Sequence, residues 1–351
     1  MPKINFILPG LSSKPGGGTK IMYEYANRFA EKGYEVTIIH SIKRPFKRAR
    51  TPLWLRHFLL RLKKNQTWFL FSSRIETKLV KEITDHDVPD ADVVISTWWQ
   101  MTYAVAQLSD KKGRKFNLIQ DYEIWTGQEE RVRKSYSLGI QNVVIAKYLA
   151  TLVQEITGHV PIHIPNAIDT NVFNLETPID QRNPYSVIML YSEEARKGSL
   201  YGIEALLKVK EKCPLLSVTL FSTFRRPPSL PAWIVFQHRP TNLPELYNQN
   251  AIFISPSLGE GWALPPAEAM ACGCAVVCTD IGGHHDYAIP NETAILVEPK
   301  TTNSITESIL KLIDEQDFRK NIALRAHQNI TSQFSWDVSV KKMEDMFFQK
   351  S

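Results

Sequence analysis

The residues FISPSLGEGWALPPAEAMACGCAVVC, numbered 253–278, predict a strand, a loop, a helix and a second strand. Apolar runs open and close the stretch, as expected of buried strands. Pro265 and Pro266 suit the first turn of the helix, where proline is tolerated because the first backbone N–H groups have no partner within the helix. A strand, a loop and a helix in this order form the repeating unit of a parallel α/β sheet.

The same alternation extends in both directions along the 351 residues, a length that suits about two domains. We therefore predict an α/β fold with two Rossmann-like, doubly wound domains, 1–165 and 166–333, whose strand ends face a ligand-binding cleft. In the first domain the predicted strands are 3–8, 35–40, 92–96, 116–120, 142–146 and 159–164, with a helix at 19–32. In the second domain the predicted strands are 186–191, 216–222, 233–237, 252–256 and 275–279, and the helices are 200–212, 243–249 and 265–271.

The loop before the helix at 265–271 has the composition of an anion site. Exposed backbone N–H groups of Trp262, Ala263 and Leu264, with the helix N-terminus, are predicted to bind a group such as a diphosphate. Glu260 and Glu268 bracket this site, and carboxylates bind hydroxyls rather than phosphates. A nucleotide sugar supplies both kinds of partner. The alternative is that Glu268 complements the helix dipole and Glu260 is a solvated loop residue.

This segment resembles the signature of retaining glycosyltransferase family four, which has the GT-B fold. The resemblance implies that Glu260 and the backbone around Gly261 hold the sugar and phosphates, and that Glu268 holds the ribose. Ala263 stands where the family usually has glycine. The matching residues are Pro256-Ser257, Glu260-Gly261-Trp262, Leu264-Pro265, Glu268-Ala269-Met270-Ala271 and Gly273.

Other fragments follow the order of the family. Gly16-Gly17-Gly18 resembles its glycine-rich loop, so Gly17 and Gly18 are predicted to lie against the sugar or the acceptor. Residues 164–169 resemble the family's entry to the second domain and are interpreted as a linker. Residues 334–351 are expected to form a helix that returns to the first domain. His284 and His285 follow Gly282-Gly283 and are interpreted as solvated loop residues.

The family places an arginine and a lysine on the donor diphosphate. Lys197 matches the lysine, but Ser192 occupies the position of the arginine, so Arg196 is predicted to supply the second cation. Arg225 or Arg226 is an alternative source, and a surface charge is the alternative role for Arg196. We expect neither a metal nor another cofactor. Asp85-His86-Asp87 fits an Asp-x-Asp metal motif but precedes a predicted strand instead of following one, so we discount it.

Gln120 stands where many family members have a histidine. Asp121 is predicted to orient or deprotonate the acceptor hydroxyl, and Glu123 is a second candidate for this role. The string Gln120-Asp121-Tyr122-Glu123 is similar to rhamnosyltransferase-like members of the family, which suggests a deoxysugar donor.

The net charge of +6 has a local origin. No acidic residue occurs from Val36 to Ile75, and subtracting nine of the cations in this stretch leaves −3 for the rest of the chain, which argues against a general nucleic-acid binder. In the insertion at about 43–71, one helical face carries Trp54, Leu55, Phe58, Leu59 and Leu62, while Leu53 and Leu60 fall on the basic side. The insertion is predicted to lie on an anionic membrane. Packing on its own domain and binding of a polyanionic or lipid-diphosphate acceptor are the alternatives. The nine cations are Lys43, Arg44, Lys47, Arg48, Arg50, Arg56, Arg61, Lys63 and Lys64.

We therefore expect a retaining, metal-independent glycosyltransferase that acts on a membrane-associated or polyanionic glycan or lipid-linked acceptor in cell-surface polysaccharide or glycolipid synthesis. A nucleotide-sugar epimerase or phosphorylase with the same fold, or a non-catalytic membrane-surface module, is the alternative. No secretory signal is recognisable, and Cys213, Cys272, Cys274 and Cys278 suit a reducing compartment, with the last three interpreted as packing residues rather than metal ligands. The expected location is the cytoplasm, on the inner face of the membrane.

Overall fold

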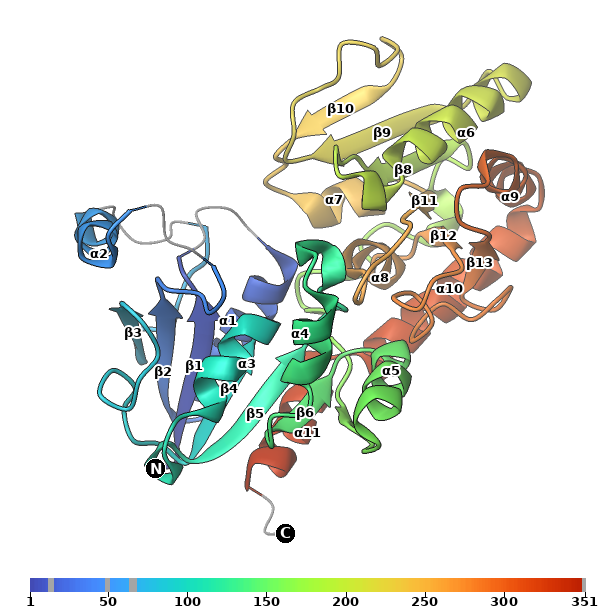
Figure 1. Ribbon diagram of the computed structural model, residues 1–351. Coiled ribbons are helices and arrows are strands. Elements are labelled where there is room, and N and C mark those ends of the chain that lie inside the picture. Colours follow the sequence, from blue (N-terminus) through green and yellow to red (C-terminus); the bar gives the residue numbers. More distant parts are fainter. Residues whose placement is uncertain (12–15, 48–50, 63–67, 349–351) are drawn as a thin grey trace. The chain divides into compact units, whose positions relative to one another are not determined.

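Two parallel sheets organise the chain in the computed structural model, which describes residues 1–11, 16–47, 51–62 and 68–348 (Figure 1). The chain divides into unit 1, Met1–Ile164 with Val340–Ser351, and unit 2, Pro165–Ser339. Each sheet has helices packed against it, because a strand with two apolar faces must be covered on both sides. The predicted α/β class with two doubly wound sheets is confirmed.

Unit 1 contains a seven-stranded sheet with the order β3-β2-β1-β4-β5-β6-β7. All neighbouring strands are parallel. The strand order reverses between β1 and β4, the place where open α/β sheets bind ligands beyond the carboxyl ends of their strands. The elements are β1 (Lys3–Pro9), α1 (Gly17–Glu31), β2 (Glu35–Ser41), α2 (Leu53–Leu62), β3 (Ile75–Val80), β4 (Val93–Thr97), α3 (Trp99–Ala106), η1 (Asp110–Lys112), β5 (Arg114–Ile119), η2 (Ile124–Thr126), α4 (Glu129–Ser135), β6 (Gln141–Val144), α5 (Lys147–Thr157) and β7 (Ile162–His163).

Unit 2 contains a six-stranded sheet with the order β10-β9-β8-β11-β12-β13, again entirely parallel. Here the order reverses between β8 and β11. The elements are η3 (Ile179–Gln181), β8 (Ser186–Leu190), η4 (Ala195–Lys197), α6 (Ser199–Lys212), β9 (Ser217–Ser222), β10 (Val235–His238), α7 (Leu243–Asn248), β11 (Ile252–Ser255), α8 (Leu264–Ala271), β12 (Ala275–Thr279), β13 (Ala294–Val297), α9 (Thr302–Asp314) and α10 (Gln316–Gln333).

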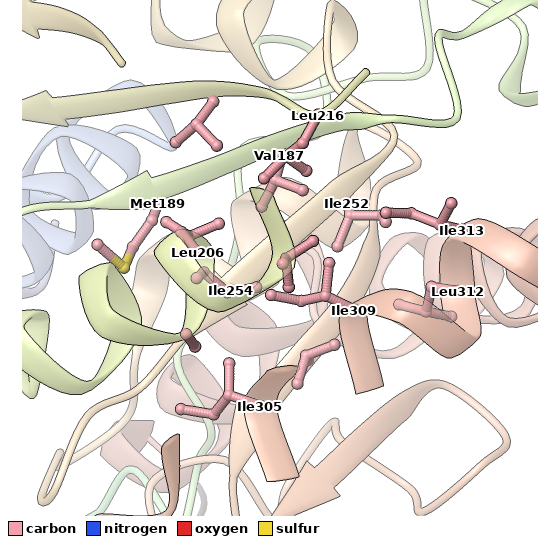
Figure 2. Close-up of a cluster of buried hydrophobic side chains, with 14 of the residues drawn as sticks. Val187, Met189, Leu206, Leu216, Ile252, Ile254, Ile305, Ile309, Leu312 and Ile313 are labelled. Carbon is pink, nitrogen blue, oxygen red and sulfur yellow. The ribbon is translucent and has the colours of Figure 1, made fainter. Parts of the chain in front are cut away.

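The core of unit 2 fixes the two strands that flank this reversal. Val187 and Met189 of β8 and Ile252 and Ile254 of β11 point to one face of the sheet, where α6 and α9 cover them (Figure 2). Alternate residues of a strand point to opposite faces, so Phe253 lies on the other side. The buried apolar positions of α9 recur every three or four residues and therefore form one face of the helix.

The last helix, α11 (Trp336–Phe348), begins in unit 2 and ends in unit 1. Within unit 1, the Tyr34 hydroxyl donates a hydrogen bond of 2.6 Å to Glu344. The ring of Phe347 lies 5.5 Å from that of Phe29 and 5.0 Å from that of Phe116. None of the helices in the described ranges combines the length and apolarity that crossing a membrane requires.

Two strands of the structure are absent from the predictions, and one predicted strand is shorter in the structure. The first of the absent strands is β3, because Glu76 and Lys78 interrupt its apolar pattern at the edge of the sheet. β13 was not predicted either, since it spans four residues directly after a turn. The strand predicted at 159–164 shortens to β7, because Pro161 has no backbone N–H for the ladder and the strand begins after it.

Candidate functional site

A pocket opens at the point where the strand order of unit 2 reverses. Its walls come from the end of β8, the end of β11 and the loop that leads to α8. In doubly wound sheets the loops diverge at this point, which leaves room for a ligand. The lining residues include Leu190, Lys197, Ser255, Ser257, Glu260 and Pro265.

A tight turn brings Lys197 to this pocket. Gly198 has φ 63°, a left-handed conformation that side chains rarely adopt. A Cβ at this position would lie 1.9 Å from the carbonyl oxygen of Pro256, so the turn can approach the end of β11 only with glycine there. The Leu258 N–H donates to the Arg196 carbonyl at 2.6 Å and joins the two loops from the other side.

Lys197 and Glu260 form a nearly buried ion pair. The Lys197 Nζ lies 2.7 Å from Glu260 Oε1 and 2.9 Å from Oε2, and the two side chains are 18% and 9% exposed. Burial alone would raise the pKa of Glu260, but the Lys197 ammonium, the Ser257 hydroxyl and Arg196 together lower it below its ordinary value. Glu260 is therefore a carboxylate at neutral pH, and the interpretation of it as a solvated loop residue is wrong.

Buried hydrogen bonds brace the loop that carries Glu260. The Ser257 hydroxyl donates to Glu260 Oε1 at 2.8 Å, and the Thr279 hydroxyl donates to the Ser257 carbonyl. His284 Nδ1 lies 2.7 Å from the Thr279 carbonyl, and its Nε2 lies 3.3 Å from the Ser255 hydroxyl. Burial lowers the pKa of His284, which keeps the ring neutral. The prediction that His284 is solvated is wrong, because it is fully buried at the end of β12.

Gly283 allows the turn after β12 to reach the same loop. A Cβ on Gly283 would lie 2.4 Å from the Glu260 carbonyl oxygen. His285, next along the chain, is half exposed and pairs with Asp280 at 2.5 Å. The contacts of His284 and Ser257 are not predictable from the sequence, although Ser257 is part of the matched signature.

Glu268 lies inside α8 and is buried. The Tyr247 hydroxyl donates to Glu268 Oε2 at 3.3 Å. Burial, together with the Glu268 carboxylate, raises the pKa of Tyr247 well above its ordinary value. Tyr247 is not predictable from the sequence as a partner of Glu268, because a tyrosine in a helix gives no sign of which side chain its hydroxyl contacts.

The predicted backbone anion site needs one correction. Trp262 and Ala263 are buried rather than exposed, and the Ala263 N–H donates to the Gly283 carbonyl at 3.2 Å. The Trp262 ring packs 4.8 Å from that of Tyr287, which anchors the loop. Gly261 precedes this buried pair, and Leu264 begins α8 and is partly exposed.

Arg196 lies close enough to act with Lys197. Its Nη1 is 3.8 Å from Glu260 Oε2, and its Nε donates to Glu194 at 3.0 Å. The side chain is 45% exposed. Arg226, the alternative source of this cation, donates instead to the carbonyls of Leu230, Pro231 and Ile234 and closes its own loop.

Unit 1 has a second polar cluster where its own strand order reverses. Gln120 follows β5, and its Nε2 donates to the Thr97 hydroxyl at 2.8 Å and to the Gly18 carbonyl at 3.0 Å. Gly17 and Gly18 form the first residues of α1. The amide of Gln120 therefore ties the ends of β4 and β5 to the start of α1.

Two acids lie beside Gln120 in a pocket of about 190 Å³. Asp121 Oδ1 accepts hydrogen bonds from the Tyr122 N–H at 2.9 Å and the Tyr148 hydroxyl at 3.3 Å. Glu123 Oε2 accepts one from the Trp99 N–H at 2.8 Å. Burial, with the nearby Asp121, raises the pKa of Glu123 to about 7. Trp98, the residue before this donor, has φ 73°, a strained conformation of the kind that clusters at functional sites.

Three large apolar side chains of α2 face solvent. Trp54, Phe58 and Leu59 are 64%, 57% and 52% exposed. On the same helix, the His57 Nε2 lies 3.1 Å from the Leu79 carbonyl of β3. Packing of the apolar face on its own domain is therefore contradicted for these three residues. Lys43 pairs with Glu82, and the Arg44 guanidinium lies 5.0 Å from the Trp98 ring. Arg48, Arg50, Lys63 and Lys64 lie outside the described residues, as does the side chain of Arg61.

The remaining candidates have structural partners. Asp85 accepts from the Ser109 N–H at 2.9 Å, and Asp87 from the Thr84 hydroxyl at 2.8 Å. Cys272, Cys274 and Cys278 are buried free thiols in the segment from α8 to β12. Burial raises the pKa of Cys274 to about 11, so this thiol is unreactive at neutral pH.

Comparison with known proteins places the unit 2 site in a family context. Residues 232–329 match the family model described as "Glycosyl transferases group 1". The capsular polysaccharide biosynthesis glycosyltransferase CapM of Staphylococcus aureus is 29% identical over 101 residues, which cover 29% of this chain and 27% of CapM. The O-antigen chain mannosyltransferase B of Escherichia coli is 30% identical over 96 residues, 27% of this chain and 24% of the relative. The matched segment thus spans about a quarter of each of these two relatives.

The fold extends the similarity to nearly the whole chain. The structure of Anabaena Alr3699/HepE in complex with UDP has a TM-score of 0.76 to this chain at 14% identity, covering 98% of this chain and 99% of the other. At this identity the likeness shows the fold alone, which is the predicted GT-B fold.

Proposed function

We propose that this GT-B chain is a retaining, metal-independent glycosyltransferase of the family-four type that uses a nucleotide-diphosphate sugar. The observation that carries the proposal is the buried Lys197–Glu260 pair at the reversal point of the unit 2 sheet. A cation and a carboxylate side by side suit a ligand that presents a phosphate and a hydroxyl to the same place.

The donor half of the reaction uses unit 2. The Lys197 ammonium has three hydrogen-bond donors, so it can hold Glu260 and still donate to a phosphate oxygen. As the nucleoside diphosphate leaves, negative charge develops on it, and Lys197 with Arg196 stabilises that charge without a metal ion. Glu260 accepts from a sugar hydroxyl and Glu268 from the ribose, while Gly261 and Leu264 supply backbone contacts.

The stereochemical course depends on whether a carboxylate of the site can attack the sugar as a nucleophile. Glu260 is engaged with Lys197 and Ser257, which suits a group that orients the sugar more than a nucleophile that attacks it. The acceptor then attacks the face from which the diphosphate departs, and the anomeric configuration is retained.

The acceptor half of the reaction uses unit 1. Gln120 and Asp121 orient the acceptor hydroxyl, and the α1 start at Gly17 and Gly18 lets the acceptor or the sugar come close to the backbone. A protonated Glu123 is a hydrogen-bond donor at neutral pH, whereas Asp121 beside it is an acceptor.

The acceptor is membrane-associated or polyanionic, a glycan or a lipid-linked molecule in cell-surface polysaccharide or glycolipid synthesis. The exposed Trp54, Phe58 and Leu59 and the exposed Arg56 on the same helix support contact with an anionic membrane at the inner face of the cell membrane. The names of the capsular polysaccharide and O-antigen relatives agree with this acceptor class.

A transfer assay tests the proposal. Sugar derivatives of UDP, ADP, GDP and dTDP are incubated with anionic lipid extracts in the presence of EDTA, and released nucleoside diphosphate is measured. We expect release that depends on both the sugar donor and the acceptor, and a product with the anomeric configuration of the donor by proton NMR. Inversion, or conversion of the donor without an acceptor, contradicts the proposal and favours a different class of enzyme.

A further inference from the structure

The Tyr247 hydroxyl is directed at Glu268 of α8. Tyr247 lies in α7 and is fully buried, and its O–H donates to Glu268 Oε2 at 3.3 Å. The proposed donor site assigns no role to this buried hydroxyl. A buried hydroxyl needs a hydrogen-bond partner, and the partner of the Tyr247 hydroxyl is Glu268, the carboxylate proposed to bind ribose.

The Tyr247 ring is fixed by its neighbours. Its centroid lies 5.7 Å from that of Phe253, 5.8 Å from that of Phe221 and 6.1 Å from that of Phe173. The first two contacts are edge-on, and all three rings belong to unit 2. With its ring held on several sides, the tyrosine keeps its hydroxyl in one place.

The backbone of Tyr247 is fixed as well. Buried Arg182 donates through Nη1 to the carbonyls of Tyr247 at 3.4 Å and Asn250 at 3.1 Å, and through Nη2 to the carbonyl of Cys272. Cys272 follows α8, so one guanidinium joins the end of α7 to the end of the helix that carries Glu268. The Cys274 thiol donates to the same Tyr247 carbonyl at 3.2 Å.

We infer that Tyr247 is a positioning residue that orients the Glu268 carboxylate for recognition of the ribose hydroxyls of a nucleoside diphosphate. A carboxylate has two oxygens that each accept more than one hydrogen bond, so a bond from Tyr247 fixes its plane and leaves it able to accept from a diol. The raised pKa of Tyr247 keeps the phenol protonated and therefore a donor. This inference rests on the proposed function, since it assumes that Glu268 binds ribose.

The experiment compares ribose with dideoxyribose on the same protein. The probe is whichever of the ribonucleotides UDP, ADP and GDP raises the melting temperature most, together with its 2′,3′-dideoxy form. Calorimetry gives the two dissociation constants for the full chain. The dissociation constant of the dideoxy form divided by that of the ribose form is the hydroxyl ratio, which measures recognition of the ribose hydroxyls. Both constants come from one sample, so a loss of folded protein affects both and leaves the ratio unchanged.

Tyr247→Phe retains the ring and removes the O–H. We expect it to lower the ratio about fivefold or more, and Glu268→Gln to bring the ratio close to one. In the double variant Tyr247→Phe adds no further loss, because its effect acts through Glu268. Thr306→Val is the matched control, since it removes another buried hydroxyl of unit 2, which donates to the Thr302 carbonyl at 2.9 Å within α9. The control should keep the wild-type ratio.

The outcomes separate the inference from its premise. The inference is overturned if Tyr247→Phe keeps the wild-type ratio while Glu268→Gln has a ratio close to one. The proposed function stands in that case. A wild-type ratio in Glu268→Gln removes the ribose assignment and, with it, the role of Tyr247. If only dTDP, which has no 2′-hydroxyl, binds the wild-type protein, the ribose diol is not recognised and the inference fails. If none of UDP, ADP, GDP and dTDP binds, the proposed function itself fails.

Discussion

Replacing Lys197 with methionine probes the ion pair at the centre of the donor site. The variant keeps a long apolar stem and removes the ammonium that lies 2.7 Å from Glu260 Oε1. Because the Glu260 side chain is only 9% exposed, water cannot replace the lost cation. Breaking a buried pair by removing one partner costs about 3–5 kcal/mol, so we expect the free energy of unfolding at pH 7 to fall by about this amount.

The pH dependence of this loss follows from the pKa of Glu260. In the wild type that pKa is lowered below its ordinary 4.5, so the stabilisation is complete above pH 4.5 and is lost as the pH falls through the lowered value. Without Lys197, only the Ser257 hydroxyl and Arg196 oppose the effect of burial, so we expect the pKa of Glu260 to rise above 4.5. The stability of the variant then declines as the pH rises from 4.5 through that raised pKa. The gap between the two proteins should therefore be widest near pH 7 and narrower at pH 5.

Urea unfolding at pH 7 and pH 5, followed by tryptophan fluorescence, measures both quantities. Lys208→Met is the matched control, because its ammonium lies 3.1 Å from Glu204 in a pair that is 39% and 56% exposed. An exposed pair of this kind contributes less than about 1 kcal/mol. Equal losses in the two variants, or a loss in Lys197→Met that does not change with pH, would refute the account of Glu260 as a buried carboxylate held by Lys197.

Three further predictions concern other parts of the chain. Gly198→Ala should lower the free energy of unfolding by about 1–3 kcal/mol and weaken nucleoside diphosphate binding, because its Cβ would meet the Pro256 carbonyl. Chemical denaturation measures the first effect and calorimetry the second. An unchanged free energy of unfolding contradicts the close approach. Wild-type stability should fall by up to about 3 kcal/mol as the pH rises from 4.5 to about 7, because the pKa of Glu123 is raised to about 7, and denaturation of Glu123→Gln over this range should lack that slope. Trp54→Ser/Phe58→Ser should weaken binding to vesicles with about 30% anionic lipid roughly 30-fold in flotation assays, while Val235→Ser, at an exposed apolar residue of β10, should not.

The sequence predicts most of unit 2 because its local signals agree with one another. The run of Ile252 and Ile254, the prolines at 265 and 266 and the apolar run at 275–279 each mark one element, and the observed bounds differ by one residue or less. β3 is different, because Glu76 and Lys78 make an edge strand look like a loop, and only pairing with β2 identifies it. Tertiary pairing carries information that a local pattern lacks.

The site is predictable in its residue types but not in its contacts. The signature at 253–278 brings out Glu260 and Glu268, and a separate resemblance brings out Lys197, 63 residues before Glu260. The fold pairs Lys197 with Glu260. The signature does not reveal that the Ala263 N–H is used by the Gly283 carbonyl. It also does not reveal the buried partners His284 and Tyr247, since their roles depend on packing between elements that come from different parts of the chain.

The central claim is that nucleoside diphosphates bind at the reversal point of the unit 2 sheet. Hydrogen–deuterium exchange of the full chain, with and without UDP, ADP, GDP and dTDP, tests the location directly. We predict slower exchange with at least one of them in peptides that cover residues 192–199 and 255–268, around Lys197, Glu260 and Glu268. Unchanged exchange in these peptides with every nucleotide, or protection confined to unit 1, would contradict the claim.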